Sequence, residues 1–232
     1  MKHSNKIFIF LGPPGSGKGT LSTICTEQFG WLLLSTGNLC RDHIARDTDL
    51  GKEIKKFSNQ GLLVPDEIIA QMVVDWLLSQ KKLPEGVIFD GYPRTLEQAK
   101  VLYEILQTKL QDFGVLLVKI NIDSQLLEDR ILGRVVCPKK DCGRTYSTKG
   151  AIELQPKKSM ICDSCESMLI CRADDTKESL QQRLKVYYQH EQDIIDFYVD
   201  KGFDICMINS AQPKQQVFKD FKNLALNNNH GC

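Results

Sequence analysis

The sequence predicts an α/β fold in which a parallel β-sheet is flanked by helices. An apolar run at residues 7–11 leads into a glycine-rich turn and then into a helical segment. Farther along the chain, short apolar runs alternate with helical segments, as in the βαβ units of a parallel sheet. The 232 residues suffice for one such domain with small inserts.

The amino-acid composition limits the kinds of binding partner that we expect. The net charge of +1 gives no electrostatic reason to expect a nucleic acid or an anionic membrane. No apolar run approaches the length of a membrane span, and the one near the start is too short for a signal sequence. We therefore expect a cytoplasmic protein that binds neither nucleic acid nor membrane.

The turn after the first strand has the residues of a phosphate-binding P-loop. It reads Gly12-Pro-Pro-Gly-Ser-Gly-Lys-Gly-Thr20. Glycines let backbone N–H groups approach an anion, and Lys18 adds a positive charge for the β- and γ-phosphates. Gly19 stands where the usual motif has a hydroxyl residue, and the hydroxyl comes one place later, at Thr20. An incidental lysine in a glycine-rich turn would not account for the strand before it and the helix, 20–29, after it.

The chain becomes more polar from residue 35 onward. Here we expect a helical insert, residues 35–65, between the first two strands of the sheet. It would contain helices at about 38–46 and 51–60. Pro65 then begins a helix that runs to about residue 80. Arg41, near a glycine turn, could meet a phosphate or lie on a solvated helix face.

A second strand, residues 87–90, ends in a carboxylate. Asp90 would lie at the carboxyl edge of the sheet beside the P-loop, where it can hold Mg²⁺ directly or through water. The other reading is that it caps the next helix. Gly91 permits close backbone approach, Pro93 stiffens the turn, and Arg94 offers a forked donor to a phosphate.

The remaining elements continue the alternation of helices and strands. Arg130 and Arg134 are four residues apart, so we expect them to share one helical face. Arg183 falls in the first turns of a long helix. The expected elements are helix 96–110, strand 115–120, helix 124–132, helix 176–201, strand 203–208 and helix 213–226.

Four clustered cysteines predict a metal site in a β-rich insert, residues 133–175. Cys137 and Cys142 are followed, nineteen residues on, by the pair Cys162 and Cys165. Two thiolate pairs around a small hairpin segment indicate closed tetrahedral Zn²⁺, which would be structural because four thiolates leave no open position. Iron could occupy such a site, and unligated reduced cysteines are the other reading.

These features together point to phosphoryl transfer. The P-loop, Asp90 and six arginines supply positioning and charge neutralisation, and we find no obvious nucleophile. Two inserts beside one P-loop suggest two lids that exclude water from the site. The arginines are Arg41, Arg94, Arg130, Arg134, Arg172 and Arg183.

From Lys6 to about Phe221 the chain resembles the adenylate kinase family, in particular the long-lid bacterial type with zinc in the lid. The family's P-loop, Gly-x-Pro-Gly-x-Gly-Lys-Gly-Thr, accounts for Gly19. The resemblance implies reversible Mg²⁺-dependent conversion of ATP and AMP to two ADP by a monomer. It implies a P-loop core of residues 1–34, 66–132 and 176–232, with the helical insert binding the monophosphate and the β-rich insert forming the lid.

The resemblance also implies residue roles. Lys18, Asp90, Arg94, Arg134, Arg172 and Arg183 would be catalytic, and Asp174 and Asp175 would stabilise the lid. ATP would be bound by Gly15, Ser16, Gly17, Lys18, Gly19, Thr20, Arg130, Arg134, Thr145, Tyr146 and Gln212. AMP would be bound by Thr36, Arg41, Leu62, Leu63, Val64, Gly91, Tyr92, Pro93, Arg94, Gln98, Arg172 and Arg183.

Two other functions stay open on the sequence. One is a related kinase with a different monophosphate acceptor, although Thr36 and Gln98 are typical of the AMP type. The other is a zinc-ribbon nucleic-acid or adaptor protein with a vestigial P-loop. The lysines of the β-rich insert are few, and no aromatic platform accompanies them.

Overall fold

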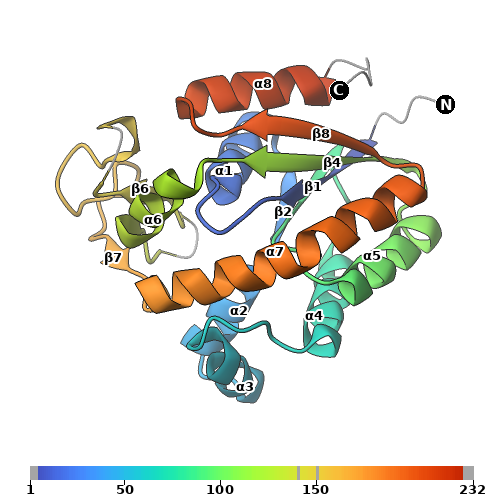
Figure 1. Cartoon of the computed structure of the whole chain (residues 1–232), viewed down its shortest axis with the longest axis horizontal. Helices are drawn as coiled ribbons and strands as arrows, with labels where there is room; N and C mark the ends of the chain where they lie inside the picture. The colour runs from blue at the N-terminus through green and yellow to red at the C-terminus, as the bar shows by residue number, and fades with distance from the viewer. Residues whose placement is uncertain (1–4, 140–141, 150–151, 227–232) are drawn as a thin grey trace.

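A computed structural model describes residues 5–139, 142–149 and 152–226. A five-stranded parallel sheet in the order β2-β3-β1-β4-β8 lies at the centre of the molecule (Figure 1). Its strands are β1 (Asn5–Leu11), β2 (Leu32–Ser35), β3 (Gly86–Asp90), β4 (Phe113–Asn121) and β8 (Asp204–Asn209). The predicted α/β class with a parallel sheet is confirmed.

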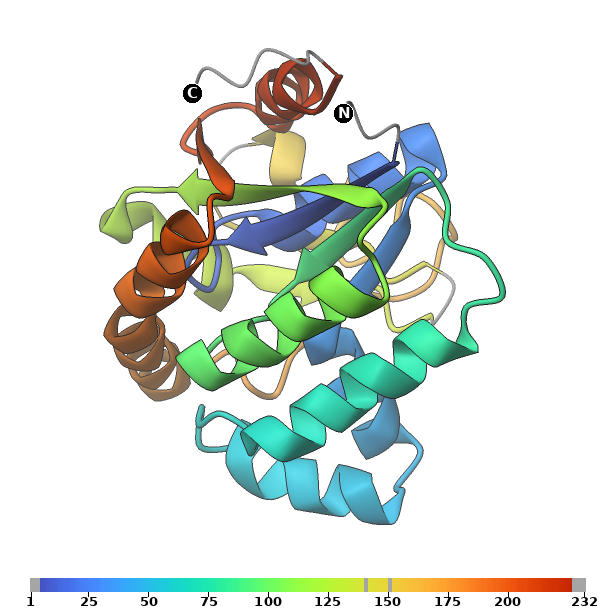
Figure 2. The same ribbon diagram turned by 90° about the vertical axis from the view of Figure 1, so that its right-hand side faces the viewer.

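Helices cover both faces of this sheet, and Figure 2 shows the sheet between the two layers. Helices α1 and α8 pack on one face, whereas α4, α5 and α7 pack on the other. The helices are α1 (Lys18–Phe29), α2 (Thr36–Ala45), α3 (Asp49–Ser58), α4 (Asp66–Ser79), α5 (Leu96–Thr108), α6 (Ser124–Leu132), α7 (Lys177–Asp200) and α8 (Lys214–Leu226). Among the described residues, no helix is both long and apolar enough to cross a membrane.

Strand β1 shows how the sequence builds this arrangement. Successive side chains of a strand point to opposite faces, so both faces of a buried strand must be apolar. Ile7 and Ile9 pack against the α5 and α7 side, while Phe8 and Phe10 pack against the α1 and α8 side. Phe221 of α8 meets both phenylalanine rings edge-on. The strand is thereby fixed at the centre of the core, with the P-loop at its carboxyl end.

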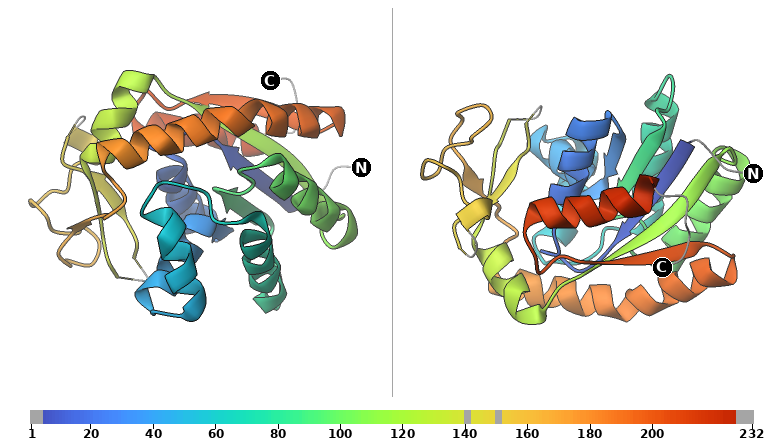
Figure 3. Two further views of the ribbon diagram at one scale, coloured as in Figure 1. Left: turned by 60° about the horizontal axis from the view of Figure 1, so that its bottom comes forward. Right: turned by 90° about the horizontal axis from the view of Figure 1, so that it is seen from above.

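Two segments lie away from the main sheet, as Figure 3 shows. One is the pair α2 and α3. The other is a small antiparallel sheet in the order β6-β5-β7. Its strands are β5 (Arg134–Val136), β6 (Thr145–Ser147) and β7 (Ile170–Cys171), and a 3₁₀ turn, η1 (Ile152–Leu154), accompanies them.

The structure corrects three expectations. Strand β2 was not predicted, and it pairs in parallel with β3 from Leu32 to Ser35. Arg130 and Arg134 do not share a helical face, because α6 ends at Leu132 and Arg134 begins β5. The five cysteines scattered outside the cluster predict ordinary thiols from the sequence, but one of them, Cys206 of β8, is disulfide-bonded.

Candidate active site

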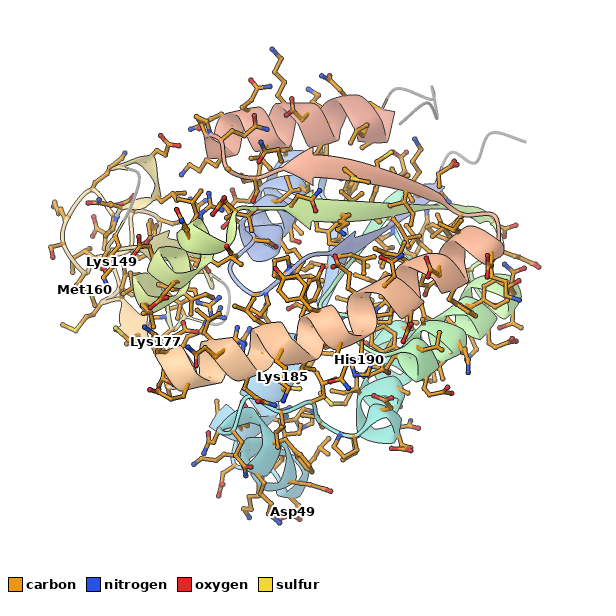
Figure 4. The ribbon with its side chains drawn as sticks, in the orientation of Figure 1. Asp49, Lys149, Met160, Lys177, Lys185 and His190 are labelled. Carbon is orange, nitrogen blue, oxygen red and sulfur yellow. The ribbon has the colours of Figure 1, made fainter. Side chains whose placement is uncertain are left out.

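A cavity of about 380 Å³ lies at the carboxyl edge of the parallel sheet. The P-loop, β3, α2, β6 and α7 all contribute to its wall. Figure 4 marks the course of α7 by Lys177, Lys185 and His190, and the helix runs from the small sheet across the central strands. Ligand sites of α/β sheets lie at this edge, and this volume suits a small ligand.

The P-loop backbone packs closely against β4 and is hydrogen-bonded to the side chain of Lys18. Gly12 and Gly15 have φ angles of +149° and +85°, and a Cβ on Gly12 would lie 2.7 Å from the Ile120 carbonyl oxygen. Lys18 donates to the carbonyl oxygens of Gly12 at 2.6 Å and Pro13 at 2.9 Å. Burial lowers its pKa to about 8, although Asp90 opposes this shift. An anion beside this ammonium would favour its charged form.

Asp90 lies at the end of β3, beside the start of α1. A Cβ built on Gly19 would lie 3.7 Å from an Asp90 carboxylate oxygen, so this carboxylate lies close to the first turn of α1. Asp90 and Thr20 both line the cavity. Carboxylate and hydroxyl oxygens are ligands that suit Mg²⁺, which is normally held by few protein groups and by substrate phosphates. The donor set therefore fits a magnesium–nucleotide complex.

Positive charge dominates the cavity. Of the residues that the structure describes, eight with cationic side chains line it, against three with carboxylates: Lys18, Arg41, Arg94, Arg130, Arg134, Arg172, Arg183 and Lys214, with Asp90, Asp174 and Glu191. Burying like charges together is unfavourable unless an anion offsets them. The lining is thus suited to polyanions such as nucleotide phosphates.

Two aspartates neutralise part of this charge. Asp175 accepts two hydrogen bonds from Arg134, at Nε (2.7 Å) and at Nη2. Arg183 donates to Asp174 Oδ2 at 3.3 Å and to Asp175 Oδ1 at 3.4 Å. Arg172 has a buried Nε with no partner among the described residues, and burial, with Arg41 and Arg134 nearby, lowers its pKa to about 9. Arg172 is thus a buried donor that an anion could satisfy.

The side of the cavity next to α2 is built by residues distant in sequence. Thr36 donates to the Gly91 carbonyl at 2.7 Å, and Arg94 Nε donates to the same oxygen at 2.8 Å. Arg41 donates to Asn38, and burial lowers its pKa. Leu62, Leu63, Val64, Pro93 and Gln98 also line this side. Tyr92 differs, because its side chain is fully buried in the hydrophobic core.

The opposite end of the cavity is formed by α6, β6 and the turn before α8. Arg130 donates from Nη2 to the Ser210 carbonyl at 2.8 Å, and burial lowers its pKa. Thr145, Tyr146 and Gln212 line the same end. The Tyr146 hydroxyl also accepts from the Asp163 backbone N–H at 2.9 Å.

The four predicted cysteines come together. Their sulfur atoms all lie within 4.8 Å of one another, with 3.4 Å between Cys137 and Cys165 and 3.6 Å between Cys142 and Cys162. Four thiolates at about 2.3 Å from a tetrahedral Zn²⁺ would be about 3.8 Å apart. The cluster therefore fits a four-coordinate metal ion.

Comparison with known proteins shows the family of the chain. Residues 10–203 of the chain match the adenylate kinase family. The chain belongs to that family. It is 37% identical to an adenylate kinase of Clostridium tetani over 93% of this chain and 96% of the relative. It is 38% identical to an adenylate kinase of Caldanaerobacter subterraneus over 94% of this chain and 95% of the relative. It is 41% identical to an adenylate kinase of Methanothrix thermoacetophila over 91% of this chain and 94% of the relative.

In this adenylate kinase family member, sequence reasoning missed some residues of the site. Glu191 and Lys214 line the cavity without having been predicted. Asp66 and Thr95 lie behind the lining and contact Gln98. A short-range signal could have found only Thr95, which precedes a helical pattern as an N-cap residue does.

Proposed function

We propose that this chain catalyses reversible Mg²⁺-dependent phosphoryl transfer from ATP to AMP, giving two ADP and serving purine nucleotide homeostasis. The observation that carries the proposal is one cavity that is lined by a P-loop and by six arginines. Phosphoryl transfer requires positioning and charge stabilisation more than covalent chemistry. Membership of the adenylate kinase family supports the choice of ATP and AMP as substrates.

In this proposal the two nucleotides occupy opposite sides of the cavity. ATP phosphates lie on the backbone of residues 15–20, and its adenine lies by Arg130 and Gln212. Thr145 and Tyr146 complete that side. AMP lies against Thr36, Arg41, Gln98 and the segments 62–64 and 91–94. Arg94, Arg134, Arg172 and Arg183 surround the transferring phosphoryl group with Lys18, and their cationic groups would stabilise its charge in the transition state.

We also propose a role for each segment of the chain. Residues 1–34, 66–132 and 176–232 form the core, residues 35–65 bind the monophosphate, and residues 133–175 form a lid over ATP. Asp90 would hold Mg²⁺ together with the nucleotide, and the bound ion would neutralise phosphate charge. Cys137, Cys142, Cys162 and Cys165 hold a structural Zn²⁺ that stabilises the lid. The protein acts as a monomer in the cytoplasm.

The test is ADP formation from Mg-ATP with AMP, CMP, UMP or GMP as acceptor, followed chromatographically. The proposal expects strong turnover with AMP. Preference for another acceptor would keep the mechanism and change the substrate, and absence of turnover across the panel would refute the proposal. A Lys18→Met variant is the control, because it removes the P-loop charge and should abolish turnover.

A further inference from the structure

Gln98 is held by a closed hydrogen-bond network behind the acceptor side of the cavity. Its Oε1 accepts from the Arg94 backbone N–H at 2.8 Å, and its Nε2 donates to Asp66 Oδ1 at 2.8 Å. Thr95 donates to the other Asp66 oxygen at 2.7 Å and accepts from the Gln98 backbone N–H at 3.1 Å. Gln98 is 1% exposed, yet it lines the cavity. The side chain is therefore locked from behind.

The chemistry of the two partners fixes which way the amide points. A backbone N–H can only donate, and a carboxylate can only accept. A flipped Gln98 amide would set its oxygen against the Asp66 carboxylate and its NH₂ group against the Arg94 N–H. Leaving two such buried groups unsatisfied is costly. Asp66 therefore enforces one orientation together with the Arg94 N–H, and it does so from the first turn of α4, 32 positions away from Gln98 in sequence.

A fixed amide presents a fixed pattern to a nucleobase. After its internal bonds, Gln98 keeps one N–H donor and one lone pair on Oε1. Adenine has a matching edge, with its 6-amino donor beside the N1 acceptor, and glutamine forms the same kind of bond pair with the 6-amino group and N7 of adenine in DNA. Hypoxanthine has a 6-oxo acceptor beside an N1–H donor. Only the flipped amide would match that base.

We propose that Asp66 is a positioning residue that sets the specificity of the acceptor site for 6-amino purines over 6-oxo purines. It acts through Gln98 and does not touch the base. This inference rests on the proposed function, because it assumes that the acceptor base meets Gln98. The residue also couples the end of segment 62–64, which lies just before α4, to the turn that carries Arg94.

Asp66→Asn tests the proposal, because asparagine keeps the size of aspartate but no longer favours one Gln98 orientation. Its side-chain amide can rotate to accept from the Gln98 NH₂ group or to donate to the oxygen of a flipped Gln98. AMP and IMP are compared as acceptors, since their bases differ only at position 6 and the adjoining N1. We expect the ratio of kcat/KM for AMP to that for IMP to fall by roughly tenfold or more, with KM for ATP unchanged. A ratio equal to that of the unmodified protein overturns the inference.

Glu67→Gln is the matched control. Glu67 is the neighbouring acidic residue in the same first turn of α4, so both variants remove one charge from that helix end. If Asp66 merely stabilised the helix, both variants would lower the melting temperature and leave the AMP:IMP ratio alone.

Equilibrium binding of AMP and of IMP to both variants, by calorimetry, gives the same ratio without turnover. Lack of turnover by the unmodified protein would thus refute the proposed function while the binding ratio still decides the role of Asp66.

Discussion

Replacing Asp175 by Asn should destabilise the protein far more than an ordinary loss of one carboxylate. The Asp175 side chain is 4% exposed and that of Arg134 is 13% exposed. Two hydrogen bonds join them, and Arg183 adds a third contact at 3.4 Å. Removing one partner of a buried pair leaves an uncompensated charge and costs about 3–5 kcal/mol. Asparagine can still accept one bond, so we expect the lower end, about 3 kcal/mol.

The assay is thermal unfolding of the ligand-free protein beside a surface control. Asp42→Asn breaks the pair with Arg46, whose side chains are 33% and 54% exposed, and should cost less than about 1 kcal/mol. For a chain of this size, 1 kcal/mol corresponds to a Tm shift of about 2–4 °C. Asp175→Asn should therefore lower Tm by about 6–12 °C. A shift no larger than that of Asp42→Asn would refute the argument from burial.

Three further predictions concern the site directly. Arg94→Ala should lower kcat by about a hundredfold or more at unchanged Tm, because Arg94 is exposed and, within the described part of the chain, its side chain bonds only to the nearby Gly91 carbonyl; near-normal kcat would contradict its role. Chelating the metal should lower Tm but preserve activity at low temperature, and immediate inactivation of folded protein would mean a catalytic metal. Since burial lowers the pKa of Lys18 to about 8, ATP binding at pH 9 should take up a proton, seen by calorimetry in buffers of different protonation enthalpy, but not at pH 6.5. If the heat of ATP binding at pH 9 did not depend on the buffer, no proton would be taken up and the prediction would be wrong.

The same shift affects stability with a definite sign. The folded-state pKa of Lys18, about 8, lies below the ordinary value of 10.5. Between these values the unfolded chain binds more protons than the folded one, so the contribution of Lys18 to stability rises with pH across that window. Below pH 8 the buried ammonium carries its full desolvation cost. A phosphate bound beside Lys18 would offset this cost, so the residue would favour ligand binding more than folding.

Local patterns in the sequence sufficed for the parts of the fold that local chemistry determines. The P-loop, strand β3 ending in Asp90, and the four cysteines each have a short signature. Strand β2 has none, because Leu32–Ser35 is only three leucines and a serine, a run that becomes a strand by pairing with β3. The small strand β5 likewise depends on β6 and β7, and this explains why the expectation that Arg134 shares a helical face with Arg130 was wrong.

Contacts between distant residues were the part that no pattern could supply. Asp66 meets Thr95 and Gln98 across 29 and 32 positions, and Arg134 meets Asp175 across 41. Nothing in the residues around Asp66 distinguishes it from Glu67, which is also an acidic residue in the first turn of a helix. Only the folded arrangement shows that one carboxylate orients Gln98 and the other does not.

The clustered cations of the cavity lower the stability of the ligand-free protein and favour the binding of anions. Arg172 and Lys18 both have lowered pKa values because each is buried among like charges. Asp174 and Asp175 offset part of this repulsion, most directly at Arg134 and Arg183, which they contact. Phosphates placed between the P-loop and these arginines would satisfy the remaining cations, Arg172 among them. A group that binds the folded form alone stabilises it by about 2.7 kcal/mol at a hundred times its dissociation constant. Nucleotide binding and the ordering of the arginines are therefore one coupled equilibrium, in which substrate provides the negative charge that the fold lacks.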